Sequence, residues 1–139
     1  MKLVTNLLFN GQCRAAFERY AAIFGGKITT MITFADAPEG AVPDCARATD
    51  GIMHAWLEAG DQAIMGCDTP PEFGREMAGF SASFHTGDVE DARRVFEALA
   101  EGGTVTMPFD TSFWSPGFGM LTDRFGTPWV INTNPEMPN

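Results

Sequence analysis

The stretch QCRAAFERYAAIFGG, residues 12–26, decides the fold, because the stretch DVEDARRVFEALAEGG at residues 88–103 repeats its pattern. Both place apolar residues three and four positions apart and end in paired glycines, as an amphipathic helix with a left-handed cap does. The repeat therefore predicts two copies of one unit, each built around a helix. A shift of 76 positions aligns the pattern: Ala16 with Ala92, Tyr20 with Phe96, Ile23 with Leu99 and Gly26 with Gly102.

Short β-rich runs lie on either side of each helix. Around the first helix, residues 12–24, we expect strands over 3–9, 27–34, 52–59 and 62–67, with Gly60 and Asp61 in a tight hairpin turn. Around the second helix, residues 89–101 with Asp88 as its N-cap, we expect strands over 80–86, 104–114, 118–122 and 128–133. The proline-containing and glycine-containing stretches 36–50 and 68–77 read as loops, and the tail 134–139 as loose.

The order of these elements predicts an α+β fold of two tandem β-α-β-β-β modules. We expect one domain over residues 1–139, with the first module over about 1–68 and the second over about 78–134. We expect the two modules to form a concave sheet with a helix on each outer face, because a single module leaves its sheet half-buried. Near the module ends the alignment shift becomes 65, which places Met65 on Val130.

Composition excludes several classes of protein. The net charge of −9 and the pI of about 4.5 oppose binding to nucleic acid; the acidity favours solubility or attracts a cationic ligand. No apolar run reaches the 18–20 or so residues of a membrane helix, and the N-terminus turns polar early, so we expect no membrane contact and a cytosolic location. Cys13, Cys45 and Cys67 are widely spaced, which argues against a disulfide framework or zinc knuckle.

Four motifs carry a family resemblance: IMHA at 52–55, MGCD at 65–68, SFWSPGFG at 112–119 and TDRFGTPWVIN at 122–132. With the repeat, they make the chain resemble the vicinal oxygen chelate superfamily of glyoxalases, ring-cleaving dioxygenases and bleomycin-resistance proteins. Within it the chain is most similar to the PhnB-like branch, which also carries the label of 3-demethylubiquinone methyltransferase. The resemblance covers nearly the whole chain.

The resemblance also implies where a metal would bind. The metal enzymes of the superfamily place His or Glu on four strands, and those slots correspond here to Thr5, Met65, Ser81 and Val130. None of the four is an imidazole or carboxylate, so we expect no metal. We expect no cofactor either, because the chain has no phosphate-binding glycine loop and no suitably placed glycine-rich turn for an adenosyl group.

Strand alternation selects the candidate binding residues. If Met53, Ala55 and Leu57 pack under a helix, the side chains of His54 and Trp56 face the concavity. On the strand at 80–86, packing of Ala82 and Phe84 leaves three polar residues facing inward: Ser81, Ser83 and His85. Each histidine is either a structural hydrogen-bonding residue or a functional one, and the recurrence of His-Ala in PhnB-like proteins favours a functional His54. Met65 and Val130 face the same concavity and should make the floor of a binding pocket there apolar.

Other candidates have two interpretations each. Asp68 follows a strand and is either a turn cap or an anchor at the mouth of the cavity. Phe113, Trp114 and Phe118 pack in the core or a dimer interface, or form a stacking wall for a flat ligand. Trp129 alternates with Val130 and is expected in the core.

These expectations lead to two hypotheses about function. The first is a metal-independent protein that binds a small molecule, with a ligand set of His54, Trp56, Met65, Asp68, Ser81, Ser83, His85, Phe113, Trp114 and Val130. The alternative is a metal-free isomerase or lyase with His54 as the general acid or base. We also expect a homodimer, because 12 Phe and 3 Trp in a small domain leave apolar surface to cover, and because superfamily members commonly pair.

Overall fold

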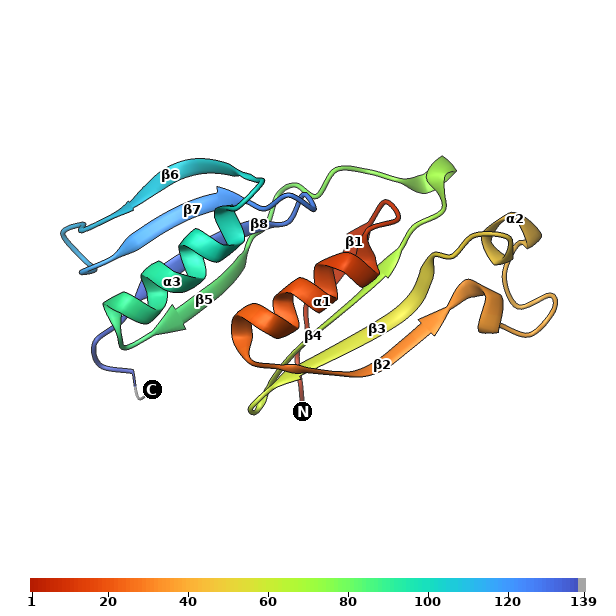
Figure 1. The fold of residues 1–139 in the computed structure, drawn as a ribbon, viewed down its shortest axis with the longest axis horizontal. Coiled ribbons are helices and arrows are strands. Elements are labelled where there is room, and N and C mark those ends of the chain that lie inside the picture. The colour runs from red at the N-terminus through yellow and green to blue at the C-terminus, as the bar shows by residue number, and fades with distance from the viewer. Residues whose placement is uncertain (138–139) are drawn as a thin grey trace. The chain divides into compact units, whose positions relative to one another are not determined.

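The computed structural model describes residues 1–137 and divides into two compact units, Met1–Glu76 and Met77–Asn139. Each unit has a four-stranded mixed sheet with a 12-residue helix (Figure 1). The prediction of an α+β fold with two β-α-β-β-β modules is confirmed. No helix in the described residues has the length and apolar content that a membrane crossing requires.

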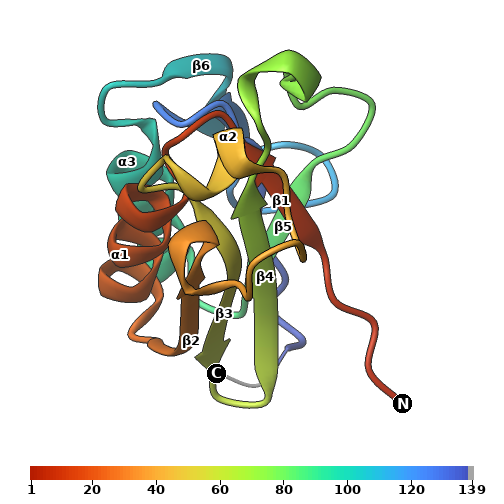
Figure 2. The same cartoon turned by 90° about the vertical axis from the view of Figure 1, so that its right-hand side faces the viewer.

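The first unit forms a sheet with the strand order β1-β4-β3-β2, in which β1 runs parallel to β4 and the other neighbours are antiparallel. Helix α1 lies to one side of β3 and β4 (Figure 2). Gly60 at φ 62° turns the chain between β3 and β4, as the hairpin motif predicts. The elements are β1 (Asn6–Phe9), α1 (Cys13–Phe24), β2 (Lys27–Thr33), the 3-10 turn η1 (Phe34–Asp36), α2 (Asp44–Arg47), β3 (Ile52–Ala59), β4 (Gln62–Asp68) and the 3-10 turn η2 (Pro71–Phe73).

Apolar residues of α1 bury the side of this sheet that faces the helix. Phe17 and Tyr20 are completely buried, and the Phe17 ring meets the Phe9 ring edge-on at 6.3 Å. Gly66 in β4 makes room for this contact, because a Cβ there would lie 2.8 Å from Cε1 of Phe17. Gly25 closes α1 in the left-handed conformation at φ 65°, as the paired glycines predict.

The second unit repeats the plan with the strand order β5-β8-β7-β6, in which β5 is parallel to β8. The Asp88 side chain caps α3 by accepting a 2.9 Å hydrogen bond from the Glu90 amide, so the predicted N-cap is confirmed. Trp129 is also in the core, as expected, at 4% exposure. The elements are β5 (Ala82–Thr86), α3 (Val89–Ala100), β6 (Thr104–Asp110), β7 (Phe118–Thr122) and β8 (Pro128–Thr133).

The predicted strand over 104–114 is too long, because β6 ends at Asp110. Beyond that residue, hydrogen bonds within a loop replace the strand ladder. The Ser112 amide donates to the Ser115 carbonyl at 2.9 Å, and the buried Ser115 hydroxyl lies 2.8 Å from the Gly117 carbonyl oxygen. The β propensity of Phe113 and Trp114 misled the prediction, whereas Ser115, Pro116 and Gly117 decide the backbone.

The predicted loop over 36–50 contains one helical turn, α2, which begins directly after Pro43. Four residues are too few to show a helical period in sequence, although proline is common at helix starts. The expected strands over 3–9 and 80–86 are shorter than predicted, since their pairing begins at Asn6 and Ala82. In the predicted loose tail, Pro138 and Asn139 lie outside the described residues.

Candidate ligand-binding sites

The face of the first sheet opposite α1 carries the predicted aromatic pair. Ala55 and Leu57 point toward the helix at 0% and 2% exposure, whereas His54 and Trp56 lie half-buried with ring centroids 6.5 Å apart. Trp56 pairs across strands with Met65, so these three predicted residues share one face. Within the described chain no hydrogen bond fixes the His54 ring, which leaves its nitrogens available.

The Trp56 ring makes two contacts on this face opposite α1, which we call the open face of the first sheet. Its indole N–H donates to Oε1 of Glu58 at 3.0 Å, and the Lys2 ammonium lies 5.7 Å from its ring centroid. The second contact is a cation–π interaction, which shows that the indole face accepts a cation from the chain itself.

The face of the second sheet opposite α3, its open face, carries three side chains that hydrogen-bond in series. Oγ of Ser83 lies 2.7 Å from Nε2 of His85, and Nδ2 of Asn132 lies 3.3 Å from the other ring nitrogen, Nδ1. Ser83 and His85 are exposed, and the apolar Met120 and Val130 lie on the same face because they pair with each other and with Ser83. The structure therefore brings the predicted residues Ser83, His85 and Val130 together; Ser81 lies just before β5.

Sequence reasoning missed Asn132, although a signal existed. Asn132 follows Val130 by two residues on β8 and so shares its face, and the parallel register places it opposite His85. Its Oδ1 is buried without a hydrogen-bond partner among the described residues. Rotating the amide by half a turn would point Oδ1 at Nδ1–H of His85 and free Nε2 to accept the Ser83 hydroxyl.

The strand registers do not support the pairing of Thr5 with Ser81 on which one of the four inferred metal slots depends. The parallel registers pair Asn6 with Met65 and Ser83 with Val130, so the first strands of the modules are related by a shift of 77, not 76. The residue equivalent to Ser81 is therefore Val4, not Thr5. The one-residue difference arises because the turn between β1 and α1 is one residue longer than the turn between β5 and α3. Valine offers no ligand atom, and the described residues contain no metal-competent group of three His, Cys, Asp or Glu.

Asp68 lies on the helix-covered side of the first sheet, where it caps α1 from a distance in sequence. Its buried carboxylate accepts three backbone N–H bonds: from Gly11 at 2.9 Å, Cys13 at 3.0 Å and Ile52 at 2.8 Å. Gln12, at the N-cap position, makes no side-chain cap, so Asp68 supplies the acceptor and the negative charge that a helix N-terminus favours. Asp68 is therefore a cap, and its role as an anchor at a cavity stays a prediction.

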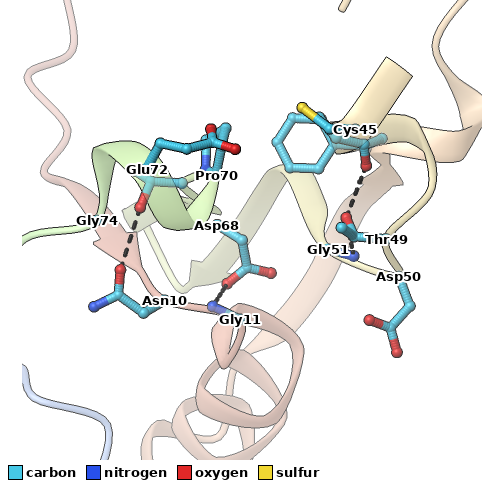
Figure 3. Close-up of a pocket in the computed structure, with 13 residues that line it drawn as sticks. Asn10, Gly11, Cys45, Thr49, Asp50, Gly51, Asp68, Pro70, Glu72 and Gly74 are labelled. Carbon is cyan, nitrogen blue, oxygen red and sulfur yellow. Dashed lines mark hydrogen bonds between the residues drawn. The ribbon is translucent and has the colours of Figure 1, made fainter. Parts of the chain in front are cut away.

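A cavity of about 610 Å³ lies beside Asp68 within the first unit. Its wall comes from the turn after β1, Phe34, α2 with the turn that follows it, and the linker after β4. Glu72 and Cys45 lie on opposite sides of this cavity with Asp68 between them (Figure 3). Sequence reasoning missed it because most of its wall comes from segments that read as unstructured loops.

The three cysteines differ in reactivity. Burial raises the pKa of the Cys13 thiol to about 12, and the nearby Asp68 carboxylate adds to this effect. Burial also raises the pKa of Cys67, again with a contribution from Asp68. Cys45 is the exposed thiol and lines the cavity, so it is the most accessible nucleophile of the three.

The predicted aromatic cluster lies on the surface of the second unit. Phe113 is 97% exposed and Trp114 54% exposed, and their rings meet edge-on with centroids 4.7 Å apart. Phe118 joins them, since its ring centroid lies 5.2 Å from that of Trp114. These exposures rule out packing of Phe113 and Trp114 in the core of the second unit and leave an interface or a ligand-stacking surface.

Comparisons with known proteins place the chain in a family. The family model described as 3-demethylubiquinone-9 3-methyltransferase matches residues 1–132. The protein YjdN of Escherichia coli (strain K12) is 31% identical over 99% of both chains.

Several solved structures share the fold of this chain. Protein PA1353 from Pseudomonas aeruginosa is 41% identical, with a TM-score of 0.87 over 96% of this chain and 98% of its own. The PhnB protein of Bacillus cereus, described as a putative 3-demethylubiquinone-9 3-methyltransferase, has a TM-score of 0.76 at 24% identity over 96% of this chain and 100% of its own. The fosfomycin resistance protein FosX from Mesorhizobium loti, at 10% identity over 99% of this chain and 92% of its own, shares the fold with a TM-score of 0.60. The chain therefore belongs to the 3-demethylubiquinone-9 3-methyltransferase family.

Proposed function

We propose that this protein binds a small molecule without a metal ion, through residues on the open faces of its sheets. The observation that carries the proposal is the hydrogen-bonded chain of Ser83, His85 and Asn132 among apolar neighbours. Small-molecule sites combine mostly apolar surface with a few fixed polar groups, and this face has that composition. His54, Trp56 and Met65 give the open face of the first sheet the same character.

The turns after the first strand of each module do not favour methyl transfer, despite the family description. Nucleotide-type cofactors bind where a glycine-rich turn joins a strand to a helix and brings backbone N–H groups to the ligand. Here β1 leads into α1 through Asn10, Gly11 and Gln12, and β5 leads into α3 through Gly87 and Asp88. The Gly11 and Cys13 amides already donate to Asp68, so the first turn offers few free donors.

The second candidate function is general acid–base catalysis without a metal, in an isomerase or lyase. The sequence pointed to His54, which has free ring nitrogens but no orienting partner in the described chain. His85 has the stronger geometry, because partners at both nitrogens fix the plane of its ring. A catalytic imidazole needs such orientation to hold one nitrogen toward the reacting proton.

Substitution of the polar residues tests the proposal. We expect fragments identified by ¹H–¹⁵N NMR in the presence of EDTA to bind His85→Gln and Ser83→Ala roughly 5–10-fold more weakly, which is the loss of about one hydrogen bond. His54→Ala should weaken fragments that bind the first sheet. All three side chains are exposed or half-buried, so melting temperatures should change little.

The matched control is Glu97→Gln, which replaces an exposed side chain on α3 and should leave fragment binding unchanged. Turnover of a fragment with a bell-shaped pH dependence would favour the acid–base candidate. A large drop in the melting temperature of His54→Ala with unchanged affinities would show that His54 is structural and that the first-sheet site is wrong.

We further propose that the protein is a homodimer that covers the exposed aromatic cluster of Phe113, Trp114 and Phe118. An exposed aromatic group of this kind is typical of an interface. Sedimentation at micromolar concentration should give twice the 15.1 kDa chain mass, and the substitution Trp114→Ser should shift the protein toward the monomer. A monomer at every accessible concentration would rule out the dimer.

A further inference from the structure

We infer that the cavity beside Asp68 is a second binding site, for a small molecule that carries an ammonium group next to an apolar or aromatic portion. This site goes beyond the proposed function, because none of its wall residues belongs to the Ser83–His85–Asn132 chain or to the His54 and Trp56 pair. Its volume of about 610 Å³ falls in the range of roughly 300–1,000 Å³ that ligand pockets occupy.

The charge of the cavity wall selects a cation. Asp50, Asp68 and Glu72 line the cavity, and its wall contains no Lys or Arg. The side chains of Asp50 and Glu72 make no ion pair or hydrogen bond within the described residues. The net charge of −9 adds a long-range attraction for cations, so the potential here favours an ammonium group over a neutral or anionic one.

Asp68 gives this charge a fixed position. The residue is 5% exposed, and three backbone N–H groups hold its carboxylate, so we expect its rotamer to stay the same when a ligand binds. An ionised carboxylate has about four acceptor positions, and the three amides leave about one for a ligand N–H. Glu72 lies across the cavity from Cys45 and is free to approach the same cation (Figure 3).

The remainder of the wall determines the rest of the ligand. Phe34, Ala46 and Pro70 are half-buried or buried and provide an apolar surface. The Thr49 hydroxyl is already engaged, because it donates to the Ala46 carbonyl at 2.7 Å and accepts from the Gly51 amide at 3.2 Å. An apolar or aromatic group therefore suits this side of the cavity better than a second charge.

Cys45 provides a direct readout of occupancy. It is exposed and lines the cavity, whereas Cys13 is buried and Cys67 is half-buried with a pKa raised by burial, so Cys45 should react first. We expect phenethylamine at millimolar concentration to slow the alkylation of Cys45 by iodoacetamide at least threefold, with saturation. Phenethyl alcohol and phenylacetate at the same concentration should not slow it, because they lack the cation.

Neutralising the cavity carboxylates tests the electrostatic part of the argument. Asp50→Asn combined with Glu72→Gln should weaken the protection by phenethylamine about tenfold, since each exposed charge contributes about a factor of three. The matched control, Asp61→Asn with Glu97→Gln, removes the same total charge from exposed positions outside the cavity and should keep full protection.

Three results would overturn the inference: no protection by phenethylamine, equal protection by all three compounds, or equal loss of protection in both double variants. Failure of this experiment leaves the open-face proposal standing, because His85→Gln and Ser83→Ala do not alter the cavity. In turn, those two variants should keep the protection of Cys45 by phenethylamine.

Discussion

Asp68→Ala should lower the free energy of unfolding by about 3–5 kcal/mol, because it leaves three backbone N–H groups without an acceptor. An unsatisfied buried polar group costs about 1–3 kcal/mol, and the adjacent cavity allows some rehydration. The N-terminus of α1 also loses its negative charge. For a chain of 139 residues this loss corresponds to a fall in melting temperature of about 10–15 °C, measured by calorimetry.

The control is Asp50→Ala, which removes the same charge from an exposed side chain without hydrogen bonds and should change the stability by about 0.5 kcal/mol or less. Asp68→Asn should fall between the two, since an amide oxygen still accepts but its NH₂ group faces amide donors. If Asp68→Ala melted at the same temperature as Asp50→Ala, Asp68 would not be the cap of α1.

Gly103→Ala should destabilise the second unit by about 2–4 kcal/mol through overpacking. A Cβ at this position would overlap the carbonyl oxygen of Thr122 and lie 2.9 Å from Cα of Asp123. Both are backbone atoms at the end of β7 and just after it, so no side-chain rotation can relieve the contact. Urea unfolding should show a lower midpoint with an unchanged slope.

Gly79→Ala separates overpacking from the ordinary cost of replacing a glycine. Gly79 has a φ of 79°, and a Cβ at this position would meet nothing within 4 Å, so alanine there incurs only the left-handed strain of about 1–2 kcal/mol. A smaller loss for Gly103→Ala than for Gly79→Ala would contradict the close approach of the turn between α3 and β6 to the end of β7.

Most of the fold was predictable because its signals are local. The apolar periodicity of residues 12–24 and 89–100, the paired glycines and the Gly60 hairpin each depend on a few neighbouring residues. The strands over 52–59, 118–122 and 128–133 were predicted to the residue, since alternation and turn residues bound them on both sides. The predicted strand over 104–114 was wrong beyond Asp110. The loop that follows is held by the hydrogen bond from the Ser115 hydroxyl to the Thr133 carbonyl, a contact between residues far apart in sequence.

The candidate sites were less predictable, because they depend on register and on loops. Alternation alone placed the side chains of His54 and Ala55 on opposite faces of the sheet. The alignment of the two modules was wrong by one residue at Thr5, because the turn between the first strand and the helix differs in length between the modules. Asn132 became a candidate only through its pairing with His85. The cavity depends on the packing of irregular segments around Asp68, for which no periodic sequence signal exists.

The most direct test of the central claim, metal-free binding on the open sheet faces, is a fragment titration of EDTA-treated protein followed by ¹H–¹⁵N NMR. We predict that bound fragments shift the backbone amides of Ser83, His85 and Asn132 and the side-chain nitrogens of His85 and Asn132, and that added zinc or manganese leaves the fragment affinities unchanged. Binding that disappears with EDTA and returns with the metal would contradict the claim, as would a complete set of fragments that never perturbs these three residues.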